Sequence, residues 1–586
     1  MQPHSFFLPS IIAAAVSKRS GVSPEAGLAG PAFPRPSFLR GSDALASAIG
    51  NFDRYVDSST PIQSNQTAWA VAVFSTNDAE PLYERYYTPE FDVGVSQVDR
   101  DSVFRIASVS KVFSVWSFLL EVGDAHFNDP ITRYVPELAT IANESTTTNE
   151  VVYDDIDHVR WEEVTLGQLA GQLAGIPRDP AQTDLSAQYS QEQTMTLGLP
   201  PLSNEEIPQC GVPGLLRSCT RSEMISQLLK QHPIFSTAYS PAYSNVAYAL
   251  LGFAQEAATG TPVGEAISAG IMSALDMRSS SYDTAPKSGG VIPGNASAVG
   301  WDYDLGTTSP SGALYSSTGD MIKAGQAILG SKTMKPAQTR RWLKPMSQTG
   351  VLGSAVGAPW EIRYLMLGGR VAQLYTKQGD IGGYRAAFVL SPEHDLGAII
   401  FSAAPLGSNS AAVRETLMNA VGDVFLPMAE DQARLEARRN FAGVYKDVET
   451  NSSVTIEVDD SMTGLTVKSL FSRGTEVIGD NSPFIKIFQA GQSARLFPSN
   501  LQTVKEKTSG EGTFVSRLGF RASFFNVTGD ANAVQDPGLM QWTSLGAPTY
   551  GARTLDDWVF ELNEDGTAKA IDVRMLRLRM GKGSVS

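Results

Sequence analysis

The 586-residue sequence has no long apolar run and comparatively little positive charge. No stretch reaches the roughly 18 consecutive apolar residues that a membrane-spanning helix needs. Lysine and arginine number 46 against 61 aspartates and glutamates, which gives a net charge of -15. Because the phosphate backbone of nucleic acid attracts positively charged surfaces, this balance argues against a DNA or RNA partner. We therefore expect no membrane span and no nucleic-acid partner.

Histidine is also scarce. The chain has five histidines, and no two of them have the spacing of a metal-binding pair. It lacks the G-x-S-x-G turn that carries the nucleophile of α/β-hydrolases, and it lacks a G-x-x-x-x-G-K-[ST] phosphate-binding loop. These absences argue against those hydrolases and nucleotide-binding proteins, and the sequence indicates no cofactor.

Only two cysteines occur, Cys210 and Cys219. A short-loop disulfide and two free thiols are both compatible with this spacing. Residues 6–16 form a short apolar stretch with no basic residue before it, which is a weak secretion signal. Five N-x-Ser/Thr sequons would suit an exported glycoprotein, and they begin at Asn65, Asn143, Asn295, Asn451 and Asn526. We predict secretion, with a cytoplasmic protein as the alternative.

The length of the chain exceeds what one hydrophobic core usually organises, so at least two domains are expected. The charged, alanine-rich residues 430–439 lack an apolar face wide enough for a core helix, and the sequence changes in character beyond them. The predicted organisation is a leader over residues 1–45, a first domain over 46–428, a charged linker over 429–440 and a second domain over 441–586.

Patterning predicts a different architecture for each domain. In the first, residues 68–74 and 398–401 read as buried strands, and residues 111–120 and 245–258 read as helices, which predicts an α/β (α+β) domain with a sheet flanked by helices. In the second, short alternating segments follow one another, and residues 563–566 give a hairpin signal. The second domain is therefore predicted to be antiparallel β; its alternating segments are residues 454–458, 514–518, 558–562 and 570–574.

The first chemical motif is S-x-x-K at Ser108 and Lys111, followed by apolar turns up to residue 120. Residues three apart on a helix share a face, so the hydroxyl and the amine can meet. Burial disfavours an ammonium ion, which lets the lysine act as a base towards the serine. By itself the motif is more typical of a helix cap followed by a lysine that extends to the surface.

The second motif is Tyr243-Ser-Asn245, where a loop meets an apolar helix. A tyrosine at such an edge can relay a proton to a leaving group, and the asparagine can hydrogen-bond a substrate amide or the lysine. The alternative is that Asn245 merely begins the helix while Tyr243 packs beside it.

The third motif is Lys377-Gln-Gly379-Asp380, in a glycine-containing strand. A glycine there indicates that something approaches the backbone closely, and substrate is one candidate. The backbone N–H of Asp380, paired with that of Ser108, would form an oxyanion hole, and Lys377 would bring positive charge to the polar end of the substrate. The alternative is a glycine-rich hairpin with a surface lysine.

The three motifs become informative together, in the order S-x-x-K, Y-x-N and K-x-G. In these residues the chain resembles the serine β-lactamase-related enzymes, which include class C β-lactamases, family VIII esterases and D-Ala-D-Ala peptidases. The resemblance covers roughly residues 65–425 and implies a β-lactamase/transpeptidase-like antiparallel sheet flanked by helices. The C-terminal region loosely resembles the lipocalin-like β domain of some fungal members.

The sequence departs from that family at K-T-G, which is Lys377-Gln378-Gly379 here. An amide replaces the hydroxyl that helps to bind a β-lactam carboxylate, and Asp380 is expected to repel an anionic group. The favoured function is therefore hydrolysis of a small-molecule ester or amide through an acyl-serine. An acyltransferase or cyclase that uses the same intermediate is the first alternative, and a non-catalytic binding or scaffold protein is the second.

Overall fold

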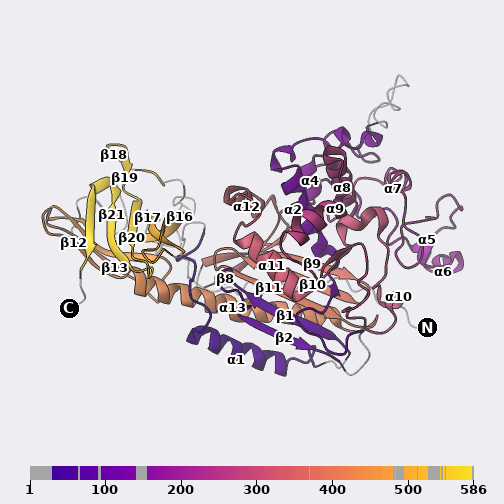
Figure 1. Cartoon of the computed structure of the whole chain (residues 1–586). Coiled ribbons are helices and arrows are strands. Elements are labelled where there is room, and N and C mark those ends of the chain that lie inside the picture. Colours follow the sequence, from indigo (N-terminus) through magenta and orange to yellow (C-terminus); the bar gives the residue numbers. More distant parts are fainter. Residues whose placement is uncertain are drawn as a thin grey trace, which may run out of the picture. The chain divides into compact units, whose positions relative to one another are not determined.

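The computed structural model describes residues 30–63, 66–89, 94–139, 155–367, 370–460, 462–479, 482, 494–510, 512–524, 542, 545–547 and 549–583. The chain divides into two compact units (Figure 1). The larger consists of Pro34–Leu367 and Val371–Glu436, and most of the smaller is Ala437–Ser586. The division between Glu436 and Ala437 lies inside the expected linker 429–440, and most of the expected leader, residues 1–29, lies outside the described residues.

An eight-stranded sheet forms the centre of the larger unit, in the order β2-β1-β11-β10-β9-β8-β7-β6. The two strands expected from the sequence are antiparallel neighbours, with Ala70 of β1 opposite Phe401 of β11. The predicted sheet is therefore confirmed. Its strands are β1 Ala68–Phe74, β2 Tyr83–Tyr87, β6 Ser347–Gln348, β7 Ser354–Val356, β8 Glu361–Leu367, β9 Arg370–Ile381, β10 Tyr384–Ser391 and β11 Leu396–Ala403.

Both faces of the sheet are buried along β1, β10 and β11. Alternate side chains of a strand point to opposite faces, so each face contacts a different core. Ala70 and Phe74 belong to the core that includes α2 and α8, whereas Val71 and Val73 belong to the core that includes α1 and α13. Figure 1 shows these two groups of helices on opposite sides of the sheet. The helices expected over 111–120 and 245–258 are α2 and α8.

The helices of this unit are α1 Asp43–Ser58, α2 Ser110–Glu121, α4 Leu166–Ala170, α5 Leu185–Gln188, α6 Gln191–Thr196, α7 Arg221–Leu228, α8 Val246–Thr259, α9 Val263–Ile267, α10 Ala296–Val299, α11 Thr318–Leu329, α12 Pro336–Trp342 and α13 Ser410–Phe441. A small sheet of β3 Phe104–Arg105, β4 Ser281–Tyr282 and β5 Leu314–Ser316 accompanies the short 3-10 helices η1 Ala107–Val109 and η7 Gly306–Ser311. No helix in the described ranges is both long and apolar enough to cross a membrane.

The expectation that residues 430–439 do not form a core helix is wrong, because they continue α13. Ala429 and Ala433 give this part of the helix a narrow buried stripe. The carboxylate of Glu436 is buried as well, and it accepts hydrogen bonds from the backbone N–H groups of Ser37 and Phe38 at 2.8 and 2.9 Å. Buried polar groups with partners can thus replace the wide apolar face that the sequence lacks.

The C-terminal unit is antiparallel β, as predicted. The additional pairing of β13 with β14 closes strands β13-β12-β22-β21-β20-β17-β16-β14 into a barrel, and the 563–566 hairpin joins β20 to β21. Its strands are β12 Gly443–Asp447, β13 Ser452–Glu457, β14 Leu465–Ser472, β15 Thr475–Ile478, β16 Ala494–Glu506, β17 Thr513–Ser523, β18 Thr549–Tyr550, β19 Arg553–Thr554, β20 Asp557–Leu562, β21 Ala568–Val573 and β22 Leu578–Lys582.

Candidate active site

Ser108 lies in η1, the tight turn between β3 and α2. The preceding residue, Ala107, has φ of 46°, a left-handed conformation that costs an L-residue about 1–2 kcal/mol. Contacts from a distant segment hold the turn in place. Ser110 Oγ donates to the Ala107 carbonyl at 2.6 Å and accepts from the Leu314 N–H at 3.0 Å. The strained turn thus fixes Ser108 immediately before the first turn of α2.

Lys111 follows one turn later, and its side chain is completely buried. Its Nζ lies 3.1 Å from Ser108 Oγ and donates to Asn245 Oδ1 and to the Ser311 carbonyl, both at 2.7 Å. Burial lowers the pKa of Lys111 to about 8. An appreciable share of the amine is therefore neutral near physiological pH.

Tyr243 comes from the loop before α8, and its hydroxyl donates to Ser108 Oγ at 2.8 Å. The centre of its ring lies 4.9 Å from Lys111 Nζ and 5.2 Å from Lys377 Nζ. Burial by itself raises the pKa of the phenol, but the positive charges of the two lysines outweigh burial and lower the pKa of Tyr243. Its proton can therefore move more easily than that of a free tyrosine.

Asn245 connects the lysine to a residue that the sequence analysis missed. Its Oδ1 accepts from Lys111, and its Nδ2 donates to Asp179 Oδ1 at 2.8 Å. The carboxylate of Asp179 therefore fixes which end of the amide faces the lysine. Asp179 belongs to none of the three motifs, and Asn245 lies 66 positions further along the chain, so local spacing did not indicate this contact.

Lys377, on β9, is also buried, and its ammonium group pairs with the carboxylate of Glu361. It also donates to the Gln378 carbonyl at 2.8 Å. Burial by itself lowers the pKa of Lys377, but the negative charge of Glu361 more than compensates and raises it. Sequence analysis missed Glu361, which lies on the neighbouring strand β8. Lys377 is therefore charged, and its charge is already paired.

The close approach expected at Gly379 is made by the chain itself. A Cβ atom on Gly379 would lie 2.2 Å from the Ile106 carbonyl oxygen and 2.9 Å from the backbone nitrogen of Ser108. The glycine thus allows β9 to pass directly beside the turn that carries Ser108. This contact brings the backbone after Gly379 next to the N–H of Ser108.

Gln378 and Asp380 direct their side chains to the other face of β9, because they alternate with Lys377 and Gly379. Gln378 Nε2 lies 3.9 Å from Met418 Sδ of α13, and both carboxylate oxygens of Asp380 accept from Arg414 of α13 at 2.9 Å. Arg385 also pairs with Asp380, at 3.0 Å. The expectations that the Gln378 amide replaces a substrate-binding hydroxyl and that the Asp380 carboxylate repels an anionic substrate are therefore not met, because both side chains point to α13.

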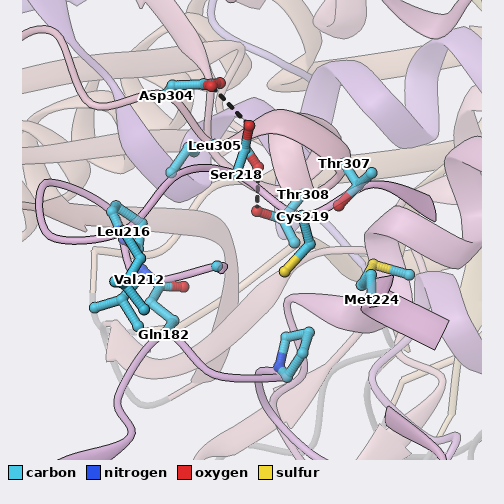
Figure 2. A pocket seen from close by; sticks show the side chains of 13 residues that line it. Gln182, Val212, Leu216, Ser218, Cys219, Met224, Asp304, Leu305, Thr307 and Thr308 are labelled. Atoms are coloured by element: carbon cyan, nitrogen blue, oxygen red, sulfur yellow. Dashed lines mark hydrogen bonds between the residues drawn. The ribbon is translucent and has the colours of Figure 1, made fainter. Parts of the chain in front are cut away.

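Cys210 and Cys219 form a disulfide, which decides between the two alternatives left open by the sequence. The loop that they close borders a cavity of about 20 Å³ (Figure 2). Ser218 and Asp304 are two of its lining residues, and Ser218 Oγ donates a hydrogen bond to the Asp304 carboxylate at 2.8 Å. A space of this size holds about one water molecule, so the cavity is too small for an acyl substrate.

Two of the five sequons can be located. Asn295 begins α10 and Asn451 lies in the turn before β13, and both are exposed. Asn65, Asn143 and Asn526 lie outside the described residues. Across the described part of the chain, no group of three or more His, Cys, Asp or Glu side chains is arranged to hold a metal ion.

Comparison with known proteins gives matches to both units. A family model described as Beta-lactamase matches residues 60–423, and one described as Beta-lactamase-like-like, C-terminal domain, matches residues 433–584. A beta-lactamase-like protein of Arthroderma benhamiae is 27% identical over 532 residues, which cover 85% of this chain and 84% of that protein. A protein of a Phoma species, named as a probable hydrolase, is 26% identical over 501 residues, which cover 82% and 78%.

Solved structures are also similar. A D-stereospecific amidohydrolase from Streptomyces sp. has a TM-score of 0.45 and 14% identity, covering 64% of this chain and 97% of that one. A beta-lactamase/D-alanine carboxypeptidase from Yersinia pestis has a TM-score of 0.47 and 17% identity, covering 66% and 100%.

Proposed function

The chain belongs to the beta-lactamase family, and from that premise we propose that it is a serine hydrolase that cleaves an ester or amide through an acyl-enzyme at Ser108. The observation that carries the proposal is the position of Ser108 Oγ, which lies 3.1 Å from Lys111 Nζ and 2.8 Å from the Tyr243 hydroxyl. A nucleophile within hydrogen-bond reach of a base is the arrangement that covalent acyl transfer requires.

In the proposed reaction the neutral amine of Lys111 takes the proton of Ser108 as Oγ attacks the acyl carbonyl. With a pKa of about 8, roughly a tenth of the lysine is neutral at pH 7. Tyr243 then passes a proton to the departing oxygen or nitrogen and recovers one from the Lys111 ammonium, and the lowered pKa of its phenol supports this role. In the second half of the reaction water gives a proton to Lys111 as it attacks the acyl-serine, and Ser108 regains a proton through Tyr243 as the acid leaves.

The negative charge on the carbonyl oxygen is assigned to the backbone N–H groups of Ser108 and Asp380. The contact of Gly379 with the Ser108 turn supports this assignment, because it brings the two backbone segments together. Removing one such donor from an enzyme typically costs about 10²–10³ in kcat. Asp380 contributes through its backbone only, since its side chain pairs with arginines on the other face of the strand.

A fluorophosphonate probe tests the proposal directly. We expect it to label Ser108 in the folded protein, as located by peptide mass spectrometry, and we expect no labelling of Ser108→Ala. A folded wild-type protein that does not label at Ser108 would show that the hydroxyl is not activated. Ester turnover with and without an added alcohol or amine then distinguishes hydrolysis from acyl transfer.

We also propose that the protein is secreted. The Cys210–Cys219 disulfide supports this localisation, because disulfides persist in oxidising compartments. Fractionation of a producing culture, with detection of the native chain in the medium or in the cells, tests it.

A further inference from the structure

Glu361 is held beside Lys377 by three consecutive residues of β9. Its backbone carbonyl accepts from Thr376 Oγ1 at 2.6 Å, and its carboxylate accepts from Lys377 Nζ and from the Gln378 N–H, the latter at 3.0 Å. The carboxylate is therefore fixed by both a charge and a backbone donor. A side chain held in this way does not readily release its partner.

The partner of Glu361 is the lysine that could attract an anionic substrate. Lys377 is 1% exposed and lies 5.2 Å from the centre of the Tyr243 ring, so its charge is within the candidate site. Because Glu361 neutralises that charge, a carboxylate on the substrate would gain little from Lys377. The side chain of Glu361 is 36% exposed, so this ion pair is partly open to solvent.

Among the described residues, Arg178 is the only cation besides Lys111 and Lys377 that contacts the Tyr243 ring. Arg178 lies 4.8 Å from the ring centre, and its Nε pairs with Asp179 at 3.2 Å. Its side chain is 61% exposed, where solvent and salt screen its charge. Near Tyr243, the cations other than the proposed base thus each have a carboxylate partner.

We propose that Glu361 determines the charge preference of the site: by occupying Lys377 it favours acyl substrates without a carboxylate near the scissile bond and excludes anionic ones. This inference rests on the proposed function and narrows it to neutral or cationic esters and amides. Glu361 acts by pairing with Lys377, so that a substrate carboxylate would lose its hydration without gaining a counter-charge.

The test compares 3-acetoxybenzoate with its methyl ester, two acetyl esters that differ in one negative charge. We expect the wild type to prefer the methyl ester in kcat/KM, and we expect Glu361→Gln to shift the ratio towards the anion at least about ten-fold, through a lower KM for the anion. The glutamine has nearly the same shape, so the strand pairing should persist. Glu84→Gln is the matched control. Glu84 lies on β2 and pairs with Arg100, so its loss removes one carboxylate elsewhere and should keep the wild-type ratio of kcat/KM values.

The outcomes separate the two claims. The role of Glu361 would be overturned if both esters are turned over and Glu361→Gln leaves the ratio of their kcat/KM values within two-fold of wild type. A wild-type preference for the anion would overturn it as well. A ratio that moves equally in Glu84→Gln would also overturn it, because the effect would then be one of net charge. If folded wild type neither hydrolyses an ester nor labels at Ser108, the proposed function itself fails.

Discussion

The backbone nitrogen of Ser108 lies 2.9 Å from the point where a Cβ atom on Gly379 would be. Glycine is therefore the only residue type at position 379 that leaves β9 and the Ser108 turn in place. The contact is between backbone atoms, which cannot rotate away as a side chain can. It links the strand that carries the proposed oxyanion donor to the turn that carries the proposed nucleophile.

Gly379→Ala should therefore reduce activity through displacement of the Ser108 turn. We expect kcat/KM to fall at least about ten-fold, since small misplacements in an active site are costly, and stability to fall by about 1–3 kcal/mol from overpacking. Steady-state kinetics and urea unfolding measure the two effects. Gly350→Ala is the control, because an added Cβ there meets nothing within 4 Å. Equal losses in both variants would contradict the interpretation.

Ser108→Ala and Lys111→Ala should each abolish ester turnover without unfolding the domain. We expect losses of about 10³-fold or more, as for other nucleophile and base deletions. Circular dichroism and thermal melting check the fold. Turnover of any ester by either folded variant, above its rate in buffer, would eliminate the mechanism.

The rate should depend on pH through Lys111. Because the neutral amine is the active form in the proposed mechanism and its pKa is about 8, kcat/KM should rise with pH about ten-fold per unit below 8 and level off above it. Lys377→Met removes a positive charge that lowers the pKa of Lys111, so the midpoint should move to higher pH. Lys468→Met, which removes an exposed lysine of the C-terminal unit, should leave the midpoint unchanged. A profile that falls between pH 6 and 8 would exclude Lys111 as the base.

Asp179→Ala should lower kcat through Asn245. Without the carboxylate the amide can turn its NH₂ group towards Lys111, which removes one of the two acceptors that hold the lysine besides Ser108. We expect a loss of about ten-fold. Asp179→Asn retains an oxygen acceptor and should recover most of the rate. If Asp179→Asn lowers kcat as much as Asp179→Ala does, the loss comes from the missing negative charge and not from a misoriented Asn245.

Loss of the disulfide should lower stability more than activity. Closure of a loop of this length by Cys210 and Cys219 contributes about 2–3 kcal/mol on the chain-entropy estimate. Thermal melting of Cys210→Ser/Cys219→Ser, compared with wild type with and without reductant, measures the difference. The reduced wild type and the double variant should have the same melting temperature. A double variant with the melting temperature of the oxidised wild type would show that the disulfide does not contribute to stability.

Local pattern predicted much of the architecture. Alternation and apolar runs indicated β1, β11 and the antiparallel C-terminal strands. The three-residue spacing from Ser108, just before α2, to Lys111 in its first turn indicated that the two side chains can meet. The failure over residues 430–439 has a physical cause. A helix can bury a narrow alanine stripe when its polar groups find partners, and the partners of Glu436 come from residues about 400 positions earlier.

The sequence alone determined which groups could do chemistry here: a serine one helical turn before a lysine, a tyrosine two residues before an asparagine, and a lysine two residues before a glycine. Tertiary structure alone decided what those groups meet. It directed Asp380 to the arginine on α13, brought Asp179 to Asn245 and paired Lys377 with Glu361, because strand register and the packing of distant segments set these contacts and neither can be read from local spacing.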